Sequence, residues 1–152
     1  MIELKKIDIA DAERLRQMQE TAFSELLRKY KDYDTSPACE SLETIQRKIS
    51  TSDFYYIEYN EKTVGAIRIV NKGESCRVSP VFIMPDFRDC GYASAAMRIA
   101  ETLYPDVRIW ELDTIMQEDY LVGMYERLGF IPTGETYDIK NGMTIIFMQK
   151  TI

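Results

Sequence analysis

One stretch of the chain, residues 81–97, constrains the fold more than any other. Its apolar start, residues 81–84, is typical of a buried strand, and Pro85 ends that strand because proline cannot donate to a sheet ladder. Apolar residues then recur at helical spacing, at Ala93, Ala96, Met97, Ala100, Leu103 and Tyr104. The stretch therefore predicts a strand, a tight turn and a helix in direct succession.

The turn between this strand and helix has the chemistry of a phosphate site. A helix start leaves about four backbone N–H groups without intrahelical partners and carries roughly half a positive charge. Gly91 lets a ligand approach the backbone closely, and Arg88 adds a permanent cation with forked donors. These features predict a diphosphate cradle, and the alternative is an ordinary turn whose arginine faces solvent.

Two motifs resemble the GNAT superfamily of N-acetyltransferases. Residues 88–93 (RDCGYA) resemble its R/Q-x-x-G-x-G/A pyrophosphate signature, and residues 124–130 (MYERLGF) resemble its Y-x-x-x-G-F segment. The two occur in the family's order, and the resemblance is strongest over residues 81–134. It implies an N-acetyltransferase that uses acetyl-CoA as co-substrate and no metal.

Composition narrows the function further. The chain has 152 residues, enough for one domain over residues 1–152 with a substantial core. It contains no histidine, which excludes Ser-His-Asp catalysis and histidine-bearing zinc sites. Its net charge of −6 argues against nucleic-acid binding and is compatible with an amine-bearing partner.

The predicted location is cytoplasmic, with no membrane partner. No apolar run approaches the roughly 18 residues that span a bilayer, and the first residues lack a signal-peptide core. Three cysteines, an odd number without metal-ligand spacing, fit a reducing compartment.

Periodicity along the chain predicts an α+β fold. Strands are expected at residues 2–7, 54–59, 63–70, 76–83, 107–113, 131–139 and 143–149, and helices at 12–30, 41–49, 93–104 and 117–128. The resemblance makes this a GNAT fold, a mixed and mostly antiparallel sheet of about seven strands flanked by about four helices. Pro80 implies a bulge or an unpaired edge in its strand, and alternation puts Val78 and Phe82 on one face of that strand.

Single residues also predict where some elements end. Ser41 is the expected N-cap of the second helix, and Gly129 is the expected C′ residue of the last helix. Asn141-Gly142 signals a type I′ turn.

The resemblance also implies where acetyl-CoA would bind. Backbone groups of Val81, Phe82 and Ile83 would pair with the pantetheine amides at a point where two strands diverge. The pyrophosphate would lie on the turn, and its residues are Arg88, Asp89, Cys90, Gly91, Tyr92 and Ala93. Glu118 occupies a position where many members carry a cofactor-contacting asparagine, so it joins the candidate cofactor-binding residues.

Catalytic and acceptor residues follow from the same resemblance. Tyr125 matches the tyrosine that many members place near the CoA sulfur as general acid, and its alternative role is that of a core aromatic. Glu111 is the candidate general base, with Asp113 on the same strand face. Tyr30, Tyr33 and Asp34 are acceptor-site candidates, and the alternative is that they belong to a solvated loop.

The predicted reaction moves the acetyl group of acetyl-CoA to a primary amine of a small molecule, peptide or protein, by direct attack in a ternary complex. The alternative is a non-catalytic, CoA-binding sensor or interaction module. An apolar last strand is compatible with a homodimer.

Overall fold

The computed structural model describes all residues 1–152 and contains one seven-stranded sheet in the order β1-β2-β3-β4-β5-β7-β6. The strands are β1 (Ile2–Lys6), β2 (Asp53–Tyr59), β3 (Lys62–Asn71), β4 (Ser75–Ile83), β5 (Ile109–Ile115), β6 (Ile131–Lys140) and β7 (Met143–Thr151). The helices are α1 (Ala12–Ala22), α2 (Ser24–Tyr30), α3 (Leu42–Thr51), α4 (Tyr92–Leu103) and α5 (Asp119–Arg127). The predicted α+β fold is confirmed. No helix is long and apolar enough to cross a membrane.

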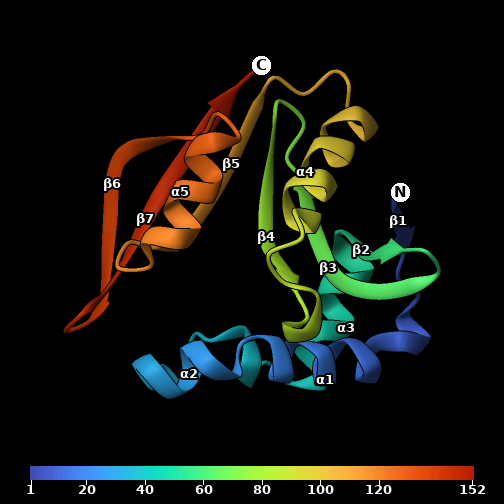
Figure 1. Ribbon diagram of the computed structural model, residues 1–152, viewed down its shortest axis with the longest axis horizontal. Helices are drawn as coiled ribbons and strands as arrows, with labels where there is room; N and C mark the ends of the chain where they lie inside the picture. Colours follow the sequence, from blue (N-terminus) through green and yellow to red (C-terminus); the bar gives the residue numbers. More distant parts are fainter.

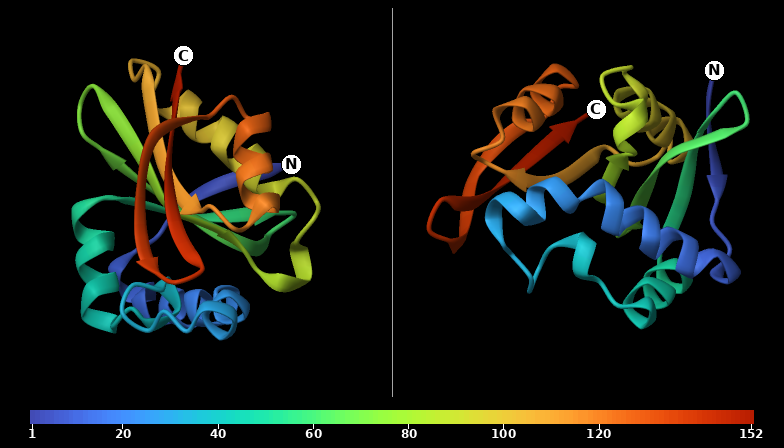
Figure 2. Two further views of the ribbon diagram at one scale, coloured as in Figure 1. Left: turned by 90° about the vertical axis from the view of Figure 1, so that its left-hand side faces the viewer. Right: turned by 60° about the horizontal axis from the view of Figure 1, so that its bottom comes forward.

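Helices cover both faces of the sheet (Figures 1 and 2). On one face, Leu15 of α1 and Ile45 of α3 pack against Phe54 of β2 in a buried cluster of 10 residues. On the other, Met97 of α4 and Tyr125 of α5 belong to a buried cluster of 16 residues. Apolar stripes on the helices and alternation along the strands produce this arrangement, because each buries one side only.

Strands β4 and β5 form the only parallel pair, and they pair over three residues each. The register joins residues 75–77 of β4 to residues 109–111 of β5, and the two strands then separate. Figure 1 shows them close at the top of the view and far apart at the bottom, where α1 and α2 lie across the opening. The sheet therefore opens in its middle, as the resemblance implied.

Pro80 forms the predicted bulge in β4. Ile67 pairs with Val81 and Ile69 with Val78, so β4 has one extra residue between these rungs, beside the cis Ser79–Pro80 peptide bond. The prediction that Val78 and Phe82 share a face was wrong. Val78 packs with α4 and Phe82 with α1, because the extra residue inverts the alternation.

The single helix predicted over residues 12–30 is two helices. Phe23 separates α1 from α2 with φ −100° and ψ 8°. Its ring packs edge-on against Phe82, with ring centroids 5.5 Å apart. Sequence periodicity continues across this break, because both helices direct apolar side chains toward the interior.

Of the residues predicted to end helices or form turns, two were correct and one was wrong. The Ser41 hydroxyl caps α3 by accepting a hydrogen bond from the Thr44 N–H over 3.1 Å, and Gly129 ends α5 with φ +100°. The type I′ turn at Asn141-Gly142 was wrong, since only Gly142 has a positive φ. Asn60 and Glu61 between β2 and β3 instead both have positive φ, at 49° and 67°.

Candidate active site

A cavity of about 810 Å³ occupies the gap between β4 and β5. Val81 and Ile83 line it from β4, Thr114 from β5, Tyr125 from α5 and Leu27 from α2. These four elements thus share one space, because the sheet opens where β4 and β5 stop pairing.

An ion pair joins the two strands at the end of their paired stretch. Arg77 of β4 donates to Asp113 of β5, and each side chain is 26% exposed. The guanidinium also lies 5.9 Å from the ring centre of Phe147 on β7. The pair lines the cavity at the point where it begins.

The turn before α4 presents free backbone donors. None of the N–H groups over residues 89–94 donates a hydrogen bond within the protein, and the first donor in this helix is Ala95, which bonds to the Gly91 carbonyl over 3.1 Å. Asp89 and Gly91 both have positive φ, at 63° and 78°. A Cβ built on Gly91 would meet no protein atom within 4 Å. The turn is therefore an open nest of donors at the positive end of a 12-residue helix, which fits a diphosphate.

Arg88 is bound to the protein itself. Its Nη2 donates to the Ala22 carbonyl over 2.7 Å, and its Nε donates to the Ile83 carbonyl over 3.2 Å. Its Nη1 lies 3.7 Å from the Glu25 carboxylate. The guanidinium thus adds positive charge to the turn while it ties the turn to the junction of α1 and α2.

Tyr125 faces the cavity from α5 and is only 6% exposed. Its ring packs edge-on against Phe130, and its hydroxyl has no hydrogen-bond partner in the protein. Burial, helped by the nearby charge of Asp113, raises the pKa of Tyr125 well above its ordinary value. The side chain is therefore a neutral phenol at physiological pH, with a proton available to a ligand in the cavity.

The other predicted residues divide between the cavity and its surroundings. Those that line the cavity are Tyr30, Val81, Phe82, Ile83, Arg88, Asp89, Ala93 and Glu118. Those outside its lining are Tyr33, Asp34, Cys90, Gly91, Tyr92 and Glu111. Tyr33 is 65% exposed, and the Glu111 carboxylate lies 3.3 Å from the Lys72 ammonium.

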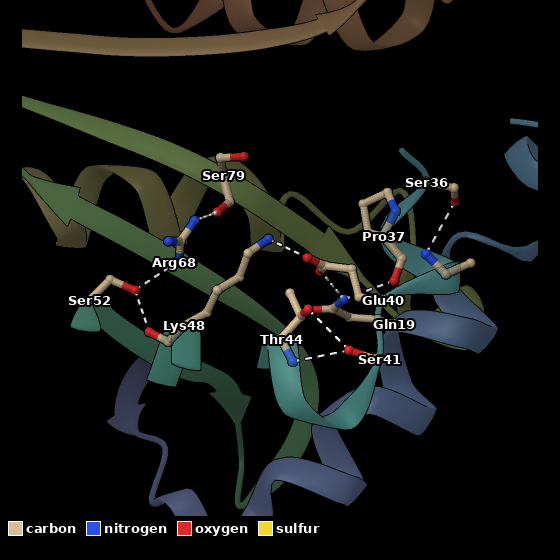
Figure 3. A network of polar contacts seen from close by, with 11 residues as sticks. Gln19, Ser36, Pro37, Glu40, Ser41, Thr44, Lys48, Ser52, Arg68 and Ser79 are labelled. Atoms are coloured by element: carbon tan, nitrogen blue, oxygen red, sulfur yellow. Dashed lines mark hydrogen bonds and ion pairs between the residues drawn. The ribbon is translucent and has the colours of Figure 1, made fainter. Parts of the chain in front are cut away.

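Sequence reasoning missed the polar end of the cavity, shown in Figure 3. Gln19, fully buried on α1, donates to the Pro37 carbonyl over 2.9 Å and to the Glu40 carboxylate over 2.8 Å. Glu40 also pairs with Lys48 of α3, and both line the cavity. The available signal was a polar residue within the apolar stripe of the first helix.

Arg68 of β3 stabilises the bulge next to this end of the cavity. It donates to the Ser79 carbonyl over 3.0 Å and to the Ser52 hydroxyl over 2.8 Å (Figure 3). The bulge leaves that carbonyl outside the regular ladder, so Arg68 supplies the missing partner.

The family model of the acetyltransferase (GNAT) domain matches residues 26–152. The chain belongs to the GNAT acetyltransferase family. It is thus an acetyl-CoA-dependent N-acetyltransferase, and the open sheet and the donor-rich turn fit acetyl-CoA as its co-substrate.

Solved structures share the fold at low sequence identity. The PaiA N-acetyltransferase of Thermoplasma acidophilum, in complex with coenzyme A, has a TM-score of 0.78 and 15% identity over 100% of this chain and 99% of that one. The ribosomal-protein-S18-alanine N-acetyltransferase of Escherichia coli has a TM-score of 0.76 and 16% identity over 100% and 94%. A GNAT acetyltransferase of Elizabethkingia anophelis with acetyl-CoA bound has a TM-score of 0.60 and 16% identity over 74% and 84%. No curated protein matches the sequence significantly.

Proposed function

We propose that this enzyme transfers the acetyl group of acetyl-CoA to a primary amine of a small molecule or of a peptide or protein, by direct attack in a ternary complex. The observation that carries the proposal is the buried phenol of Tyr125, which faces the cavity between β4 and β5. A cytoplasmic location and a homodimer stay predictions.

Charge supports an amine as acceptor. Six acidic and three basic side chains line the cavity, and Tyr30, Tyr137 and Phe147 add aromatic faces. Acidic and aromatic surfaces attract cations, so they favour an ammonium group over an anion. The acceptor must then lose a proton before it attacks.

Acetyl-CoA would bind to the turn before α4 and to the end of β4. The backbone N–H groups of residues 89–94 would hold the diphosphate, with the charge of Arg88 beside them. Backbone groups of Val81, Phe82 and Ile83 lie in β4 beyond its last rung with β5, where a pantetheine arm can pair with them. Cys90, Tyr92 and Ala93 contribute through their backbone, and a contact from Glu118 stays a prediction.

Bound acetyl-CoA supplies an activated acyl carbon and a thiolate leaving group. The amine nitrogen forms a bond to that carbon as the carbon–sulfur bond breaks. Tyr125 gives its proton to the departing sulfur and regains one from solvent. The proton lost by the amine passes to water, and Glu111, which lies outside the cavity lining, would act as general base only through that water.

Calorimetry with acetyl-CoA and a turnover assay on an amine panel test the proposal. We expect the wild type to bind acetyl-CoA and to release free thiol with at least one primary amine. Tyr125→Phe should keep the binding and lose most of the turnover. Binding without turnover on any amine would contradict the proposal and favour a CoA-binding module.

A further inference from the structure

A second set of polar contacts crosses the cavity opening, between α2 and the start of α5. The Glu118 carboxylate, at the residue before α5, accepts a hydrogen bond from the Tyr30 hydroxyl and lies 2.6 Å from the Lys29 ammonium. Both donors belong to the last turn of α2. These three residues, which we call the Glu118 clasp, join segments almost ninety positions apart in the chain.

Few polar contacts besides the clasp fix the position of α2, and the one at its C-terminal end is a long hydrogen bond from Lys140 to the Lys31 carbonyl, over 3.5 Å. The helix has seven residues, none of them buried, and it is separated from α1 at Phe23. A helix this short has no intrinsic stability in water, so contacts outside the helix must fix its position. At its first turn, Glu25 lies 3.7 Å from Arg88, and at its last turn it has the clasp.

The position of α2 determines the shape of the cavity. Leu26, Leu27 and Tyr30 of α2 line it, and so do Leu121 and Met124 of α5. The clasp therefore links these two segments directly. A movement of the last turn of α2 away from α5 would widen the cavity between them.

The surroundings of the Glu118 carboxylate favour a stable contact between α2 and α5. The Glu118 side chain is 19% exposed, which limits competition from water, whereas Lys29 is 57% exposed. Burial disfavours ionisation of the Glu118 carboxyl, but the hydrogen bonds from Lys29 and Tyr30 and the charge of Lys29 outweigh it and lower its pKa. Charge-assisted hydrogen bonds of this kind are about twice as strong as neutral ones.

We propose that Glu118 is a positioning residue that holds α2 against α5 through Tyr30 and Lys29, and so sets the width of the acceptor part of the cavity. The inference rests on the proposed function for its effect on the acceptor. It assigns Glu118 a role in acceptor selection, distinct from the cofactor contact predicted from the resemblance.

Hydrogen exchange of the α2 amides tests the clasp without any assay of activity. Glu118→Ala should speed exchange over residues 27–31 by about tenfold or more, because the free energy needed to open this segment locally falls. Tyr30→Phe and Lys29→Gln should each speed exchange by a smaller factor. Adding either substitution to Glu118→Ala should not speed exchange further, since Glu118→Ala alone already breaks the clasp. Arg28→Gln is the matched control, because Arg28 is exposed on the same helix and forms no ion pair. Unchanged exchange in Glu118→Ala would overturn the proposal.

Steady-state kinetics and calorimetry separate the two roles of Glu118. For the clasp, KM of the amine should rise about tenfold in Glu118→Ala, with a smaller change in kcat and with the Kd of acetyl-CoA within about twofold. Glu118→Gln should recover part of the KM, because its amide oxygen still accepts from Tyr30. A weakened acetyl-CoA Kd with unchanged α2 exchange would assign Glu118 to the cofactor and overturn the clasp.

The amine panel distinguishes failure of the two proposals. The ratio of kcat/KM for bulky amines to kcat/KM for the smallest amine should be higher in Glu118→Ala than in the wild type. If the wild type acetylates amines but this selectivity and α2 exchange are unchanged, the clasp is wrong and the proposed function stands. If no amine is acetylated while α2 exchange rises in Glu118→Ala, the link is supported and the proposed function is the part that fails.

Discussion

The Arg88 guanidinium donates a hydrogen bond to the Ala22 carbonyl oxygen over 2.7 Å, and so connects the turn before α4 to the last residue of α1. A second bond, to the Ile83 carbonyl, joins the same side chain to the end of β4. The turn that would hold the diphosphate is therefore tied through one side chain to the end of α1 and to the end of β4.

Arg88→Met should lower the free energy of unfolding by about 1–2 kcal/mol, because the carbonyls of Ala22 and Ile83 lose their charged hydrogen-bond donor. It should also weaken acetyl-CoA binding, since the turn loses both a cation and its anchor. Urea denaturation and calorimetry measure the two effects. Arg98→Met, an exposed arginine of α4 without an ion pair, is the control, and equal stability of the two variants would refute the anchoring role.

Gly91→Glu should abolish measurable acetyl-CoA binding while the fold survives. The space beside Gly91 is empty of protein atoms, so the new side chain costs only the strain of a positive φ, about 1 kcal/mol. Gly73→Glu controls for this strain, because Gly73 has φ +95° and equally open surroundings. If both variants bind acetyl-CoA like the wild type in calorimetry, the turn is not the diphosphate site.

Tyr125→Phe should reduce kcat about 100-fold and leave the Kd of acetyl-CoA unchanged, the usual size of a general-acid effect. The pKa of Tyr125 is raised by burial, so kcat of the wild type should show no loss from phenol ionisation up to about pH 10, the ordinary value. Stopped-flow or steady-state rates over pH 7–10 measure this. A decline centred near pH 8 that disappears in Tyr125→Phe would contradict the assignment of a raised pKa.

Arg77→Met should destabilise the fold by about 1–2 kcal/mol, because it leaves the half-buried Asp113 carboxylate without its partner. The neighbouring pair Lys72–Glu111 is a matched control, since it also joins this region to β5 but is more exposed. Lys72→Met should cost less than about 0.5 kcal/mol. Thermal and urea unfolding compare the two variants, and equal losses would show that the Arg77–Asp113 pair has no special weight.

Glu118 should contribute stability that depends on pH. Its pKa is lowered in the folded protein, so the unfolded chain binds a proton at a higher pH than the folded protein does. The contribution is complete above the unfolded pKa, about 4.3, and is lost as pH falls through the folded pKa. The stability difference between wild type and Glu118→Gln should therefore shrink below about pH 5, as measured by urea unfolding from pH 7 to 3. A constant difference over that range would contradict the lowered pKa.

Local signals predicted most elements because they depend on short stretches of chain. The Ser41 cap follows from that residue's own side-chain hydroxyl, and the bulge at Pro80 and the helix end at Gly129 follow from the backbone preferences of proline and glycine. The break at Phe23 escaped prediction because the periodicity of apolar residues continues through it. Its position depends on contacts with Phe82 and Arg88, which lie some sixty residues away.

The sequence by itself determined the α+β class and the strand, turn and helix over residues 81–97, because periodicity, proline and glycine act locally. Tyr125 became a site candidate only through the family resemblance. Only the tertiary structure decided what surrounds that turn. The three-residue pairing of β4 with β5 opens the cavity, and Gln19, Glu40 and Lys48 close its polar end. The partners of Arg88 and Glu118 were likewise decided there, since a side chain's charge is written in the sequence but the group that it meets depends on how distant segments pack.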